Sequence, residues 1–550
     1  MNRDSSKMGS RDLTNEDKLK RFLYTGTPRG YYITGNSAAR HFDKLPAIVP
    51  ITWIESSTQD FLNVLKSVNE DSLLSRRSNL FYVLAEAMTE KQLSANARQD
   101  IKKTVLELVK ADEEFFDFIQ YHTKTRNPNS KMSTSLKKII VKFYQDKRPQ
   151  DLAVCVTKHD SYHKWTHKDL FKLCHFKTDN VQCEPVIKYV LYGATKLPEA
   201  TDPVSKSIVD YLEKSNRLKV TEDVPEAVGL ITQLHFTIDR VNSKLNKEEA
   251  VWLACLSEMT TREVLQCLFR FYKWGFIKAN SEFHEKTNRM LVDAHKITQC
   301  NLHPIEVFIY LKFFEKGGKC LDPKFLAYLN QMELEADVLR RITTPIQPKC
   351  KPIIQSIKKC LKLSYSNVRP TEKRFLVSVD ATAHGDLNCY QNRRITYLEA
   401  AHAVIRYLLK VETNVSVAVF KDSQIQFVDL SKSHNAVEKM QELRGSYIDP
   451  TAPMEWAMNK KKTFDVFINI MTNDWLEHVP QQSKKKAEKV PEALAKYCKK
   501  MNLPETRVVK MFLASPAGVH ADNCRNILSI AGFTVDVPKV LEAFCRGHFC

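Results

Sequence analysis

The residues best suited to chemistry lie between positions 131 and 177, where cations, histidines and aromatic rings alternate. This stretch contains eleven Lys or Arg, four Asp, no Glu and four His. Cations neutralise phosphates and flat rings stack on bases, so this mixture favours RNA binding. The alternative is a solvated helical face with ordinary core aromatics. The helices and turns predicted around these side chains decide between RNA binding and a solvated surface.

The spacing after Thr166 predicts a short helix with two different faces, opened by a Thr166–Asp169 capping box. Its apolar stripe consists of Leu170, Leu173 and Cys174. Its cationic stripe consists of Lys168, Lys172 and His175, spaced at i, i+4 and i+7. We therefore expect the helix to bury one stripe and to present the other to an anion.

Further cations and rings flank this helix on both sides. Lys158, Lys164 and Trp165 precede it, and His167 begins it; a second basic helix nearby carries Lys137, Lys138 and Lys142. Together they favour an anion-binding surface. Acid–base cleavage of RNA by His159, His163 and His167 is the catalytic alternative. Phosphate contact or hydrogen bonding is the simpler role, because the sequence has neither paired carboxylates at nuclease spacing nor a nucleophile elbow. We therefore expect no enzyme.

Composition narrows the class of partner. The 550 residues include 83 Lys or Arg and 64 Asp or Glu, a net charge of +19, which favours a polyanion. No apolar run approaches the roughly 20 residues of a membrane-spanning helix, and the first residues include no apolar h-region, so we expect no signal peptide. The 14 cysteines form no CxxC pair, and no glycine-rich nucleotide motif is present. We expect a cytoplasmic, possibly also nuclear, protein with reduced thiols and no membrane partner.

The chain divides into two parts behind a polar tail. Residues 1–17 are expected to be disordered. Residues 18–366 show helical periodicity, and the regular rhythm of helices and short gaps suggests stacked antiparallel helix pairs. A compact helical domain is the alternative, and helical periodicity is compatible with both. Residues 372–550 alternate strands and helices, which predicts a doubly wound parallel sheet.

Within the second part, the patterns predict individual elements. Paired strands should meet at the Lys421-Asp422 turn, and a buried strand should follow at 464–474. A helix at 484–501, a strand at 507–515, a helix at 523–531, a strand at 532–537 and a last helix at 538–547 complete the domain. Asp380 and the Thr472-Asn473-Asp474 group should meet beyond the carboxyl ends of the strands.

Several segments together resemble the TROVE-domain family of Ro ribonucleoprotein autoantigens. They are KRFLYTGTPRGYYI, LAVCVTKHDSYHKWTHKDLFKLCHFK, NLHPIEVFIYLKFF, TEKRFLVSVD, FDVFINIMTND and AGFTVDVPKVLEAF, and they span nearly the whole chain. The resemblance implies a monomer in which a ring of HEAT-like helical repeats is closed by a von Willebrand factor A domain (Rossmann-like). It also implies that the outer basic surface binds small stem-loop Y RNA, and that the ring takes misfolded noncoding RNA by a single-stranded 3′ end, for RNA quality control or stabilisation.

The same resemblance assigns residues to RNA contact. Lys158 and His175 fall at positions where the family contacts RNA, Lys172 occupies a basic position of the same helix, and Lys137 and Lys138 match a second basic helix. These five are the expected RNA-binding residues. Small noncoding RNA and misfolded RNA are the expected partners.

The metal site of the A-domain family is degenerate in this sequence. The family pattern Asp-x-Ser-x-Ser reads Asp380-Ala-Thr382-Ala-His384 here, and His384 is a poor ligand for Mg²⁺. Ile448 stands where a Thr is expected, and the late acid position reads Asn473. Asp380 and Thr382 are the remaining candidates for Mg²⁺. We expect an A domain that has lost its metal and that plugs the ring or docks protein partners. A protein-interaction scaffold acting through this domain is the alternative function.

Overall fold

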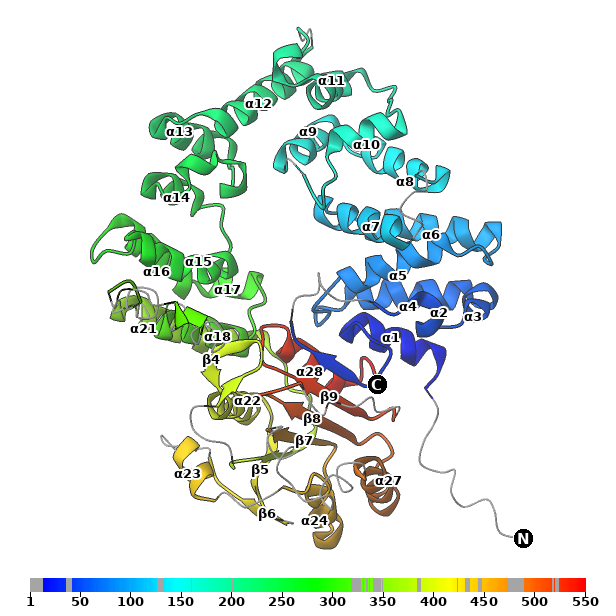
Figure 1. Ribbon diagram of the computed structural model, residues 1–550, viewed down its shortest axis with the longest axis vertical. Helices are drawn as coiled ribbons and strands as arrows, with labels where there is room; N and C mark the ends of the chain where they lie inside the picture. The colour runs from blue at the N-terminus through cyan, green and yellow to red at the C-terminus, as the bar shows by residue number, and fades with distance from the viewer. Residues whose placement is uncertain are drawn as a thin grey trace.

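A computed structural model describes most of the chain. It covers residues 13–35, 42–125, 132–159, 161–199, 202–317, 328–329, 331–332, 335, 337–339, 348, 350–382, 387–422, 424–430, 436–443, 448–472, 489–516, 519 and 524–550. The helices form an arch whose two ends return to a domain built on a β-sheet, so that the molecule closes into a ring (Figure 1). No helix within these ranges is long and apolar enough to cross a bilayer.

The arch is made of helices that pack against near neighbours in sequence, as in α5 against α6, α4 against α6 and α5 against α7. In several helices, apolar residues at three- and four-residue spacing bury one face; in α15 these are Val264, Leu265, Leu268 and Phe271. The helices are α1 (Asn15–Thr25), α2 (Leu45–Ile48), α3 (Ile51–Ser56), α4 (Thr58–Glu70), α5 (Ser78–Thr89), α6 (Ala95–Leu108), α7 (Asp112–Thr125), α8 (Thr134–Gln145), α9 (Pro149–Lys158), α10 (His167–Cys174), α11 (Glu184–Tyr192), α12 (Pro203–Val220), α13 (Val224–Leu234), α14 (Glu249–Cys255), α15 (Thr261–Trp274), α16 (Glu282–Val292), α17 (Ala294–Gln299), α18 (Pro304–Lys316) and α21 (Lys351–Ser364).

The second domain is a doubly wound sheet of strand order β1-β9-β8-β7-β2-β5-β6. All neighbours are parallel except β5 and β6, which form the predicted hairpin. The strands are β1 (Tyr31–Ile33), β2 (Arg374–Val379), β5 (Asn414–Lys421), β6 (Gln424–Phe427), β7 (Val466–Met471), β8 (Arg507–Phe512) and β9 (Ile527–Ala531), with β3 (Asn388–Cys389) and β4 (Asn392–Thr396) in a separate ribbon. The helices are α22 (Tyr397–Val411), α23 (Ala436–Glu442), α24 (Ala452–Lys460), α27 (Val490–Met501) and α28 (Val537–Arg546).

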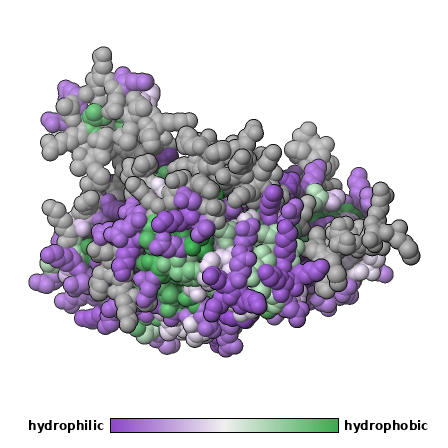
Figure 2. All heavy atoms as spheres, turned by 90° about the horizontal axis from the view of Figure 1, so that it is seen from below, coloured by the Kyte–Doolittle hydropathy of each residue, from purple (hydrophilic) through white to green (hydrophobic). Residues whose placement is uncertain are grey.

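Helices cover both faces of the sheet. Tyr397 of α22 and Val540 of α28 belong to the core on one face, and Met454 of α24 and Leu494 of α27 belong to the core on the other. This arrangement confirms the predicted doubly wound fold. The surface seen from the side of this domain is mostly hydrophilic, with a smaller apolar area (Figure 2).

The boundary between the two domains differs from the division predicted from the sequence. Strand β1 pairs in parallel with β9, with Tyr31 opposite Ser529 and Ile33 opposite Ala531. The structure thus places part of the stretch 18–366, assigned to the helical domain, in the sheet of the second domain. Helix α1 also begins at Asn15, inside the predicted tail 1–17, because Thr14 and Asp17 form a capping box.

Two predicted elements near the end of the chain are wrong. The segment 523–531 was expected to be a helix, yet residues Ile527–Ala531 form strand β9, and all five are buried. Leu528 and Ile530 pack into the core on one face of the sheet and Ile527 into the core on the other, so β9 is buried on both faces and lacks the apolar–polar alternation of a half-exposed strand. The segment 532–537 was expected to be a strand, but it turns at Gly532 with φ of 84° and leads into α28.

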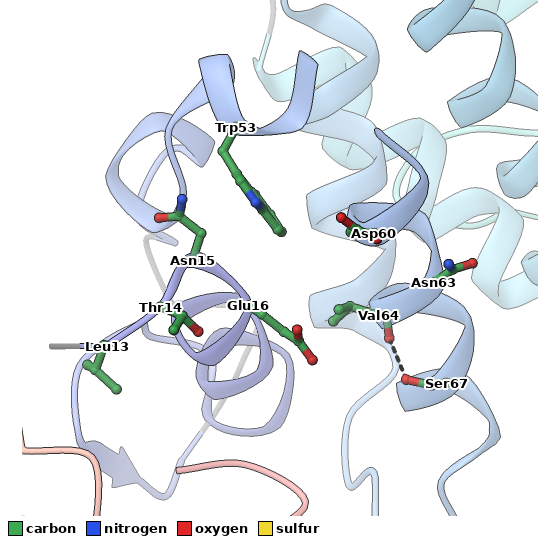
Figure 3. Close-up of a pocket in the computed structure, with 9 residues that line it drawn as sticks. All are labelled: Leu13, Thr14, Asn15, Glu16, Trp53, Asp60, Asn63, Val64 and Ser67. Carbon is green, nitrogen blue, oxygen red and sulfur yellow. Dashed lines mark hydrogen bonds between the residues drawn. The ribbon is translucent and has the colours of Figure 1, made fainter. Parts of the chain in front are cut away.

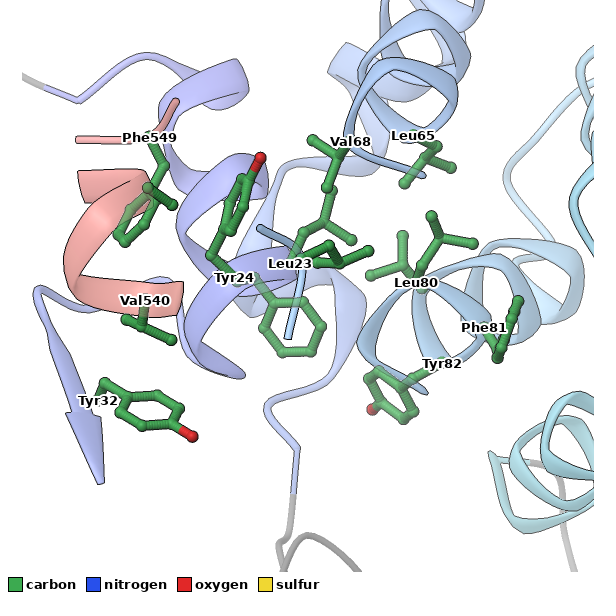
Figure 4. Close-up of a cluster of buried hydrophobic side chains, with 14 of the residues drawn as sticks. Leu23, Tyr24, Tyr32, Leu65, Val68, Leu80, Phe81, Tyr82, Val540 and Phe549 are labelled. Carbon is green, nitrogen blue, oxygen red and sulfur yellow. The ribbon is translucent and has the colours of Figure 1, made fainter. Parts of the chain in front are cut away.

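The second domain contacts both ends of the helical arch. At the first end, Tyr24 of α1 stacks on Phe549 at 4.8 Å, in a cluster that includes Val540 and Leu80 (Figure 4). At the other end, Lys316 and Lys312 of α18 approach Glu399 of α22 at 2.7 and 3.0 Å. Both junctions combine ion pairs with apolar packing: Arg76 lies 2.8 Å from Asp536 at the first end, and Ile305 and Ile309 of α18 share a core with the second domain at the other.

Candidate nucleic-acid interface

A cavity of about 720 Å³ lies between α7 and α10, within the stretch singled out for its chemistry. Its charged lining groups are Lys124, Lys164, Lys172 and Asp169, and its flat ring is the indole of Trp165. The remaining lining residues are Gln120, Thr123 and Leu173. This volume is typical of a site for a drug-sized or nucleotide-sized group.

Helix α10 supplies one wall of the cavity, and its first turn is fixed by local hydrogen bonds. The Thr166 hydroxyl accepts a hydrogen bond from the backbone N–H of Asp169 at 3.1 Å, and the Asp169 carboxylate accepts from the backbone N–H of Thr166 at 3.0 Å. The predicted capping box is therefore confirmed. It also engages Asp169 Oδ2, which accepts from both the N–H and the hydroxyl of Thr166.

The faces of α10 agree with the prediction except at one position. Leu170 and Phe171 are buried, whereas Lys168, Lys172 and His175 are exposed. Leu173, expected in the buried stripe, is 40% exposed and lines the cavity. The apolar stripe instead includes Phe171, because the buried face follows 170, 171 and 174. His175 ends the helix in a left-handed conformation, with φ of 50°.

A tight turn supplies the second wall and fixes Trp165. Tyr162 and Trp165 exchange backbone hydrogen bonds of 2.8 and 2.7 Å, with His163 and Lys164 between them at φ of 48° and 71°. Two consecutive positive φ angles define a turn that normally requires Gly, Asn or Asp. The turn holds strained residues at the cavity rim, a feature that clusters at functional sites.

The cations of the cavity are available to a ligand. Among the described residues, Lys124, Lys164 and Lys172 make no ion pair or hydrogen bond through their ammonium groups. Sequence reasoning missed Lys124 because it belongs to α7, outside the basic stretch. Its only sequence signal is a lysine in the last turn of a helix, and only the packing of α7 beside α10 places it at the cavity.

Lys158, unlike the three lysines of the cavity, has an ion-pair partner. Its Nζ lies 2.6 Å from Glu113 Oε1, an ion pair that would have to open for a phosphate to bind. Lys137 and Lys138 lie on α8, which packs against α10, and Lys138 is exposed. Burial raises the pKa of the Cys174 thiol to about 11 despite the opposing charge of nearby Lys137, which places that lysine close to the end of α10. The helices α8 and α10 thus carry adjacent cations.

The histidines of this region each contact a side chain of the fold. His167 is buried, with its Nδ1 2.9 Å from the Tyr144 hydroxyl, and burial lowers its pKa to about 4. It is therefore neutral near pH 7. His163 lies 2.6 Å from Asp117, and His159 lies 3.5 Å from Glu113. Each of these contacts orients a side chain within the fold.

A second cavity has the opposite electrostatic character. It encloses about 690 Å³ between α1, α3 and α4, with Trp53, Glu16 and Asp60 among its lining residues and, within the described chain, no Lys or Arg (Figure 3). Carboxylates repel phosphate, so this cavity is a poor site for RNA despite its indole ring.

Asp380 lies beside Thr472, as predicted, but hydrogen bonds from Thr382 and Thr472 already use the oxygens of the Asp380 carboxylate. One Asp380 carboxylate oxygen accepts hydrogen bonds from the Thr382 N–H at 2.9 Å and hydroxyl at 2.6 Å. The other accepts from the Thr472 N–H at 3.2 Å and hydroxyl at 2.6 Å. A carboxylate has about four lone-pair positions, and all four are occupied. The residues shown here therefore fit Mg²⁺ poorly.

The rest of the expected metal pattern adds little. Asp449 is buried and accepts hydrogen bonds from the Thr451 N–H and hydroxyl at 3.0 and 2.8 Å, while Ile448 is part of the apolar core. Within the described ranges, no three His, Cys, Asp or Glu side chains form a metal-binding group. His384, Asn473 and Asp474 lie outside the described residues.

These features define a class of protein: a ring of stacked helices closed by a von Willebrand factor A domain. Comparison with known proteins is consistent with that class. The model of the TROVE domain matches residues 73–237, and the model of the Ro60 vWA domain matches residues 374–545. The chain belongs to the Ro ribonucleoprotein family, characterised by the TROVE domain, as the resemblance in the sequence had indicated.

Relatives of this chain come from distant organisms. RNA-binding protein RO60 of Caenorhabditis elegans is 21% identical over 610 residues, covering 97% of this chain and 88% of the relative. RNA-binding protein RO60 of Deinococcus radiodurans is 20% identical over 418 residues, covering 74% of this chain and 71% of the relative. The crystal structure of the Deinococcus radiodurans RO (RSR) protein superposes with a TM-score of 0.77 at 17% identity, covering 97% of this chain and all of that one. This likeness confirms the fold.

Proposed function

We propose that this protein binds RNA, with the cavity between α7 and α10 as part of its binding surface. Three unpaired ammonium groups beside an indole ring carry the proposal, because they combine phosphate neutralisation with base stacking. The names of the two relatives, both RNA-binding proteins, support it. Lys137, Lys138 and His175 would extend the same surface along α8 and the end of α10.

The preferred RNA follows from the kinds of contact available. Lysines contact phosphates without reading sequence, and Trp165 can stack only on a base that has left a helix. A stem-loop or a misfolded RNA with an unpaired end offers both features. We therefore propose small noncoding stem-loop RNA and misfolded noncoding RNA as ligands, bound for stabilisation or quality control and without catalysis.

Filter binding of a stem-loop RNA at rising salt tests this function. We expect the binding constant to fall steeply with salt and Lys172→Gln to weaken binding more than Lys158→Gln, since Lys158 is already paired with Glu113. A flat salt response, or equal affinity in wild type and Lys172→Gln, contradicts the proposal. Cleavage of the RNA in the same incubation, lost in His167→Ala, contradicts the absence of catalysis.

For the second domain, we propose that it closes the ring without a bound metal and that the protein acts as a monomer in the cytoplasm. The four hydrogen bonds on Asp380 and the contacts at both ends of the arch support this role. Calorimetric titration with Mg²⁺ tests it, and tight binding contradicts it. Such binding would favour the alternative, a scaffold that docks acidic protein partners through the ion.

A further inference from the structure

A third cavity, of about 440 Å³, lies where the arch meets the second domain beside α18. Helix α15 supplies most of its lining, α18 supplies Phe313, and strand β4 of the second domain supplies Arg394. Helix α18 packs against both α15 and β4, which brings the three elements together (Figure 1). The volume falls in the range of sites for small ligands, about 300–1,000 Å³.

The polar face of α15 forms one wall of this cavity. Gln266, Arg270 and Lys273 line it at spacings of four and three residues, which places them on one face of the helix. The buried apolar stripe of α15 occupies the opposite face. All three polar side chains are exposed, so a ligand can reach them without a change in the fold.

Two cations of this wall have no acidic partner. Within the described residues, the side chains of Arg270 and Lys273 make no ion pair or hydrogen bond. The Arg270 guanidinium lies over the Trp274 ring, 5.7 Å from its centroid, a contact that uses no hydrogen-bond acceptor and leaves the N–H groups for an anion. No carboxylate lines the cavity in the part of the chain that the structure describes, so the charge there favours an anionic ligand.

Aromatic rings form the apolar part of the lining. Phe269, Trp274 and Phe313 all line the cavity and are partly buried. The Arg394 guanidinium lies over the Phe313 ring, 4.9 Å from its centroid. Rings and guanidinium planes are the surfaces on which unpaired bases stack. An acidic peptide would pair with the cations but leave the rings unused, so the lining favours an anion that carries its own flat ring.

We propose that this cavity binds a nucleotide, with its phosphate held by Arg270 and Lys273 and its base packed against the aromatic lining. Arg394 adds a third cation from the second domain, which therefore contributes to binding as well as to ring closure. The same chemistry occurs in an unpaired residue of RNA and in a free nucleotide; the RNA source rests on the proposed function. RNA held here would contact the protein at a second place, separate from the α7–α10 cavity.

Fluorescence anisotropy of the full chain tests the proposal with a labelled hexaadenylate. The measurements use the Lys124→Gln with Lys172→Gln background, in which the α7–α10 cavity has lost two cations. An abasic hexamer with the same phosphates measures the contribution of the bases. ATP and a hexaglutamate peptide serve as competitors. We expect hexaadenylate to bind and the abasic hexamer to bind at least tenfold more weakly.

Variants of α15 locate this binding. Adding Arg270→Gln with Lys273→Gln should weaken hexaadenylate at least tenfold. The matched control, Lys496→Gln with Lys499→Gln, removes two exposed cations of α27 at the same three-residue spacing and should leave binding unchanged. Arg394→Gln should weaken binding at least threefold, with thermal unfolding confirming that the variant folds. Unchanged affinity in a folded Arg394→Gln protein overturns the contribution of the second domain.

The competitors separate the possible occupants. Tighter binding of hexaadenylate than of ATP supports RNA, and tighter binding of ATP supports a free nucleotide. Absence of binding by both, equal binding of the abasic hexamer, or undiminished binding in the Arg270→Gln with Lys273→Gln variant overturns the proposal. Hexaglutamate that binds as tightly as hexaadenylate assigns the cavity to acidic peptides and also overturns it. Stem-loop binding that still depends on Lys172 in the wild-type background shows that only this cavity, and not the proposed function, has failed.

Discussion

Removing two unpaired cations from the α7–α10 cavity should weaken RNA binding by a calculable amount. Lys124 and Lys172 lie on different helices but line the same cavity, and neither has an ion-pair partner in the described chain. Two unit charges 4 Å apart in water attract by about 1 kcal/mol. The variant Lys124→Gln with Lys172→Gln should therefore lose about 2 kcal/mol, or roughly 30-fold in affinity.

Salt dependence gives an independent measure of the same contacts. Each phosphate neutralised contributes about 0.7 to 0.9 to the slope of log binding constant against log salt, so the double variant should lose about 1.4 to 1.8 from that slope. Filter binding of one stem-loop RNA between 50 and 300 mM salt measures both quantities. Lys460→Gln is the control for a lost surface charge. Unchanged affinity and slope in the double variant would refute the assignment of this cavity to phosphate.

Three further predictions concern the turn, the ring closure and the stacking site. Trp165→Ala should cost about 1–3 kcal/mol in binding of unpaired RNA, and little with a blunt duplex, because stacking requires an exposed base; competition between the two RNAs measures this, and equal losses would contradict stacking. Lys164→Gly should weaken RNA binding yet raise the free energy of unfolding by up to about 1 kcal/mol, since φ of 71° strains a side chain; denaturant unfolding checks it, and a loss of stability would contradict it. Glu399, where burial is outweighed by Lys316 and the Thr396 N–H, has its pKa lowered from 4.5 to about 2. Its contribution to the free energy of unfolding is therefore present above pH 4.5 and lost as pH falls toward 2, on the order of 2–3 kcal/mol. Glu399→Gln should flatten the stability profile in that window, and an unchanged profile would argue against stabilisation by the ion pairs of Glu399 with Lys312 and Lys316.

The fold was predictable from sequence where periodicity is clear. The alternation of strands and helices after residue 372 predicted the doubly wound sheet, and the Lys421-Asp422 turn marked the β5–β6 hairpin. The exceptions have a common cause. Strand β9 is buried on both faces, and β1 joins the sheet from the far end of the chain, so neither carries a local signal of its tertiary environment.

The make-up of the proposed RNA-binding surface was predictable only in part, for a similar reason. Lys164, Trp165 and Lys172 belong to one contiguous stretch, and their spacing on the turn and helix α10 brought them together in the prediction as in the structure. Lys124 joins them through helix packing, and Lys158 leaves them through its ion pair with Glu113. Such pairings across elements depend on tertiary contacts that one sequence does not display.

Crosslinking the intact protein to a bound stem-loop RNA, followed by mass spectrometry of the crosslinked peptides, tests the central claim most directly. Peptides that contain Trp165 and Lys172 should dominate, with α7 around Lys124 as the second region, and at an RNA concentration near the wild-type Kd they should fall sharply in the Lys124→Gln with Lys172→Gln variant. Crosslinks confined to the second domain, or equally abundant in wild type and variant, would contradict the claim that the α7–α10 cavity binds RNA.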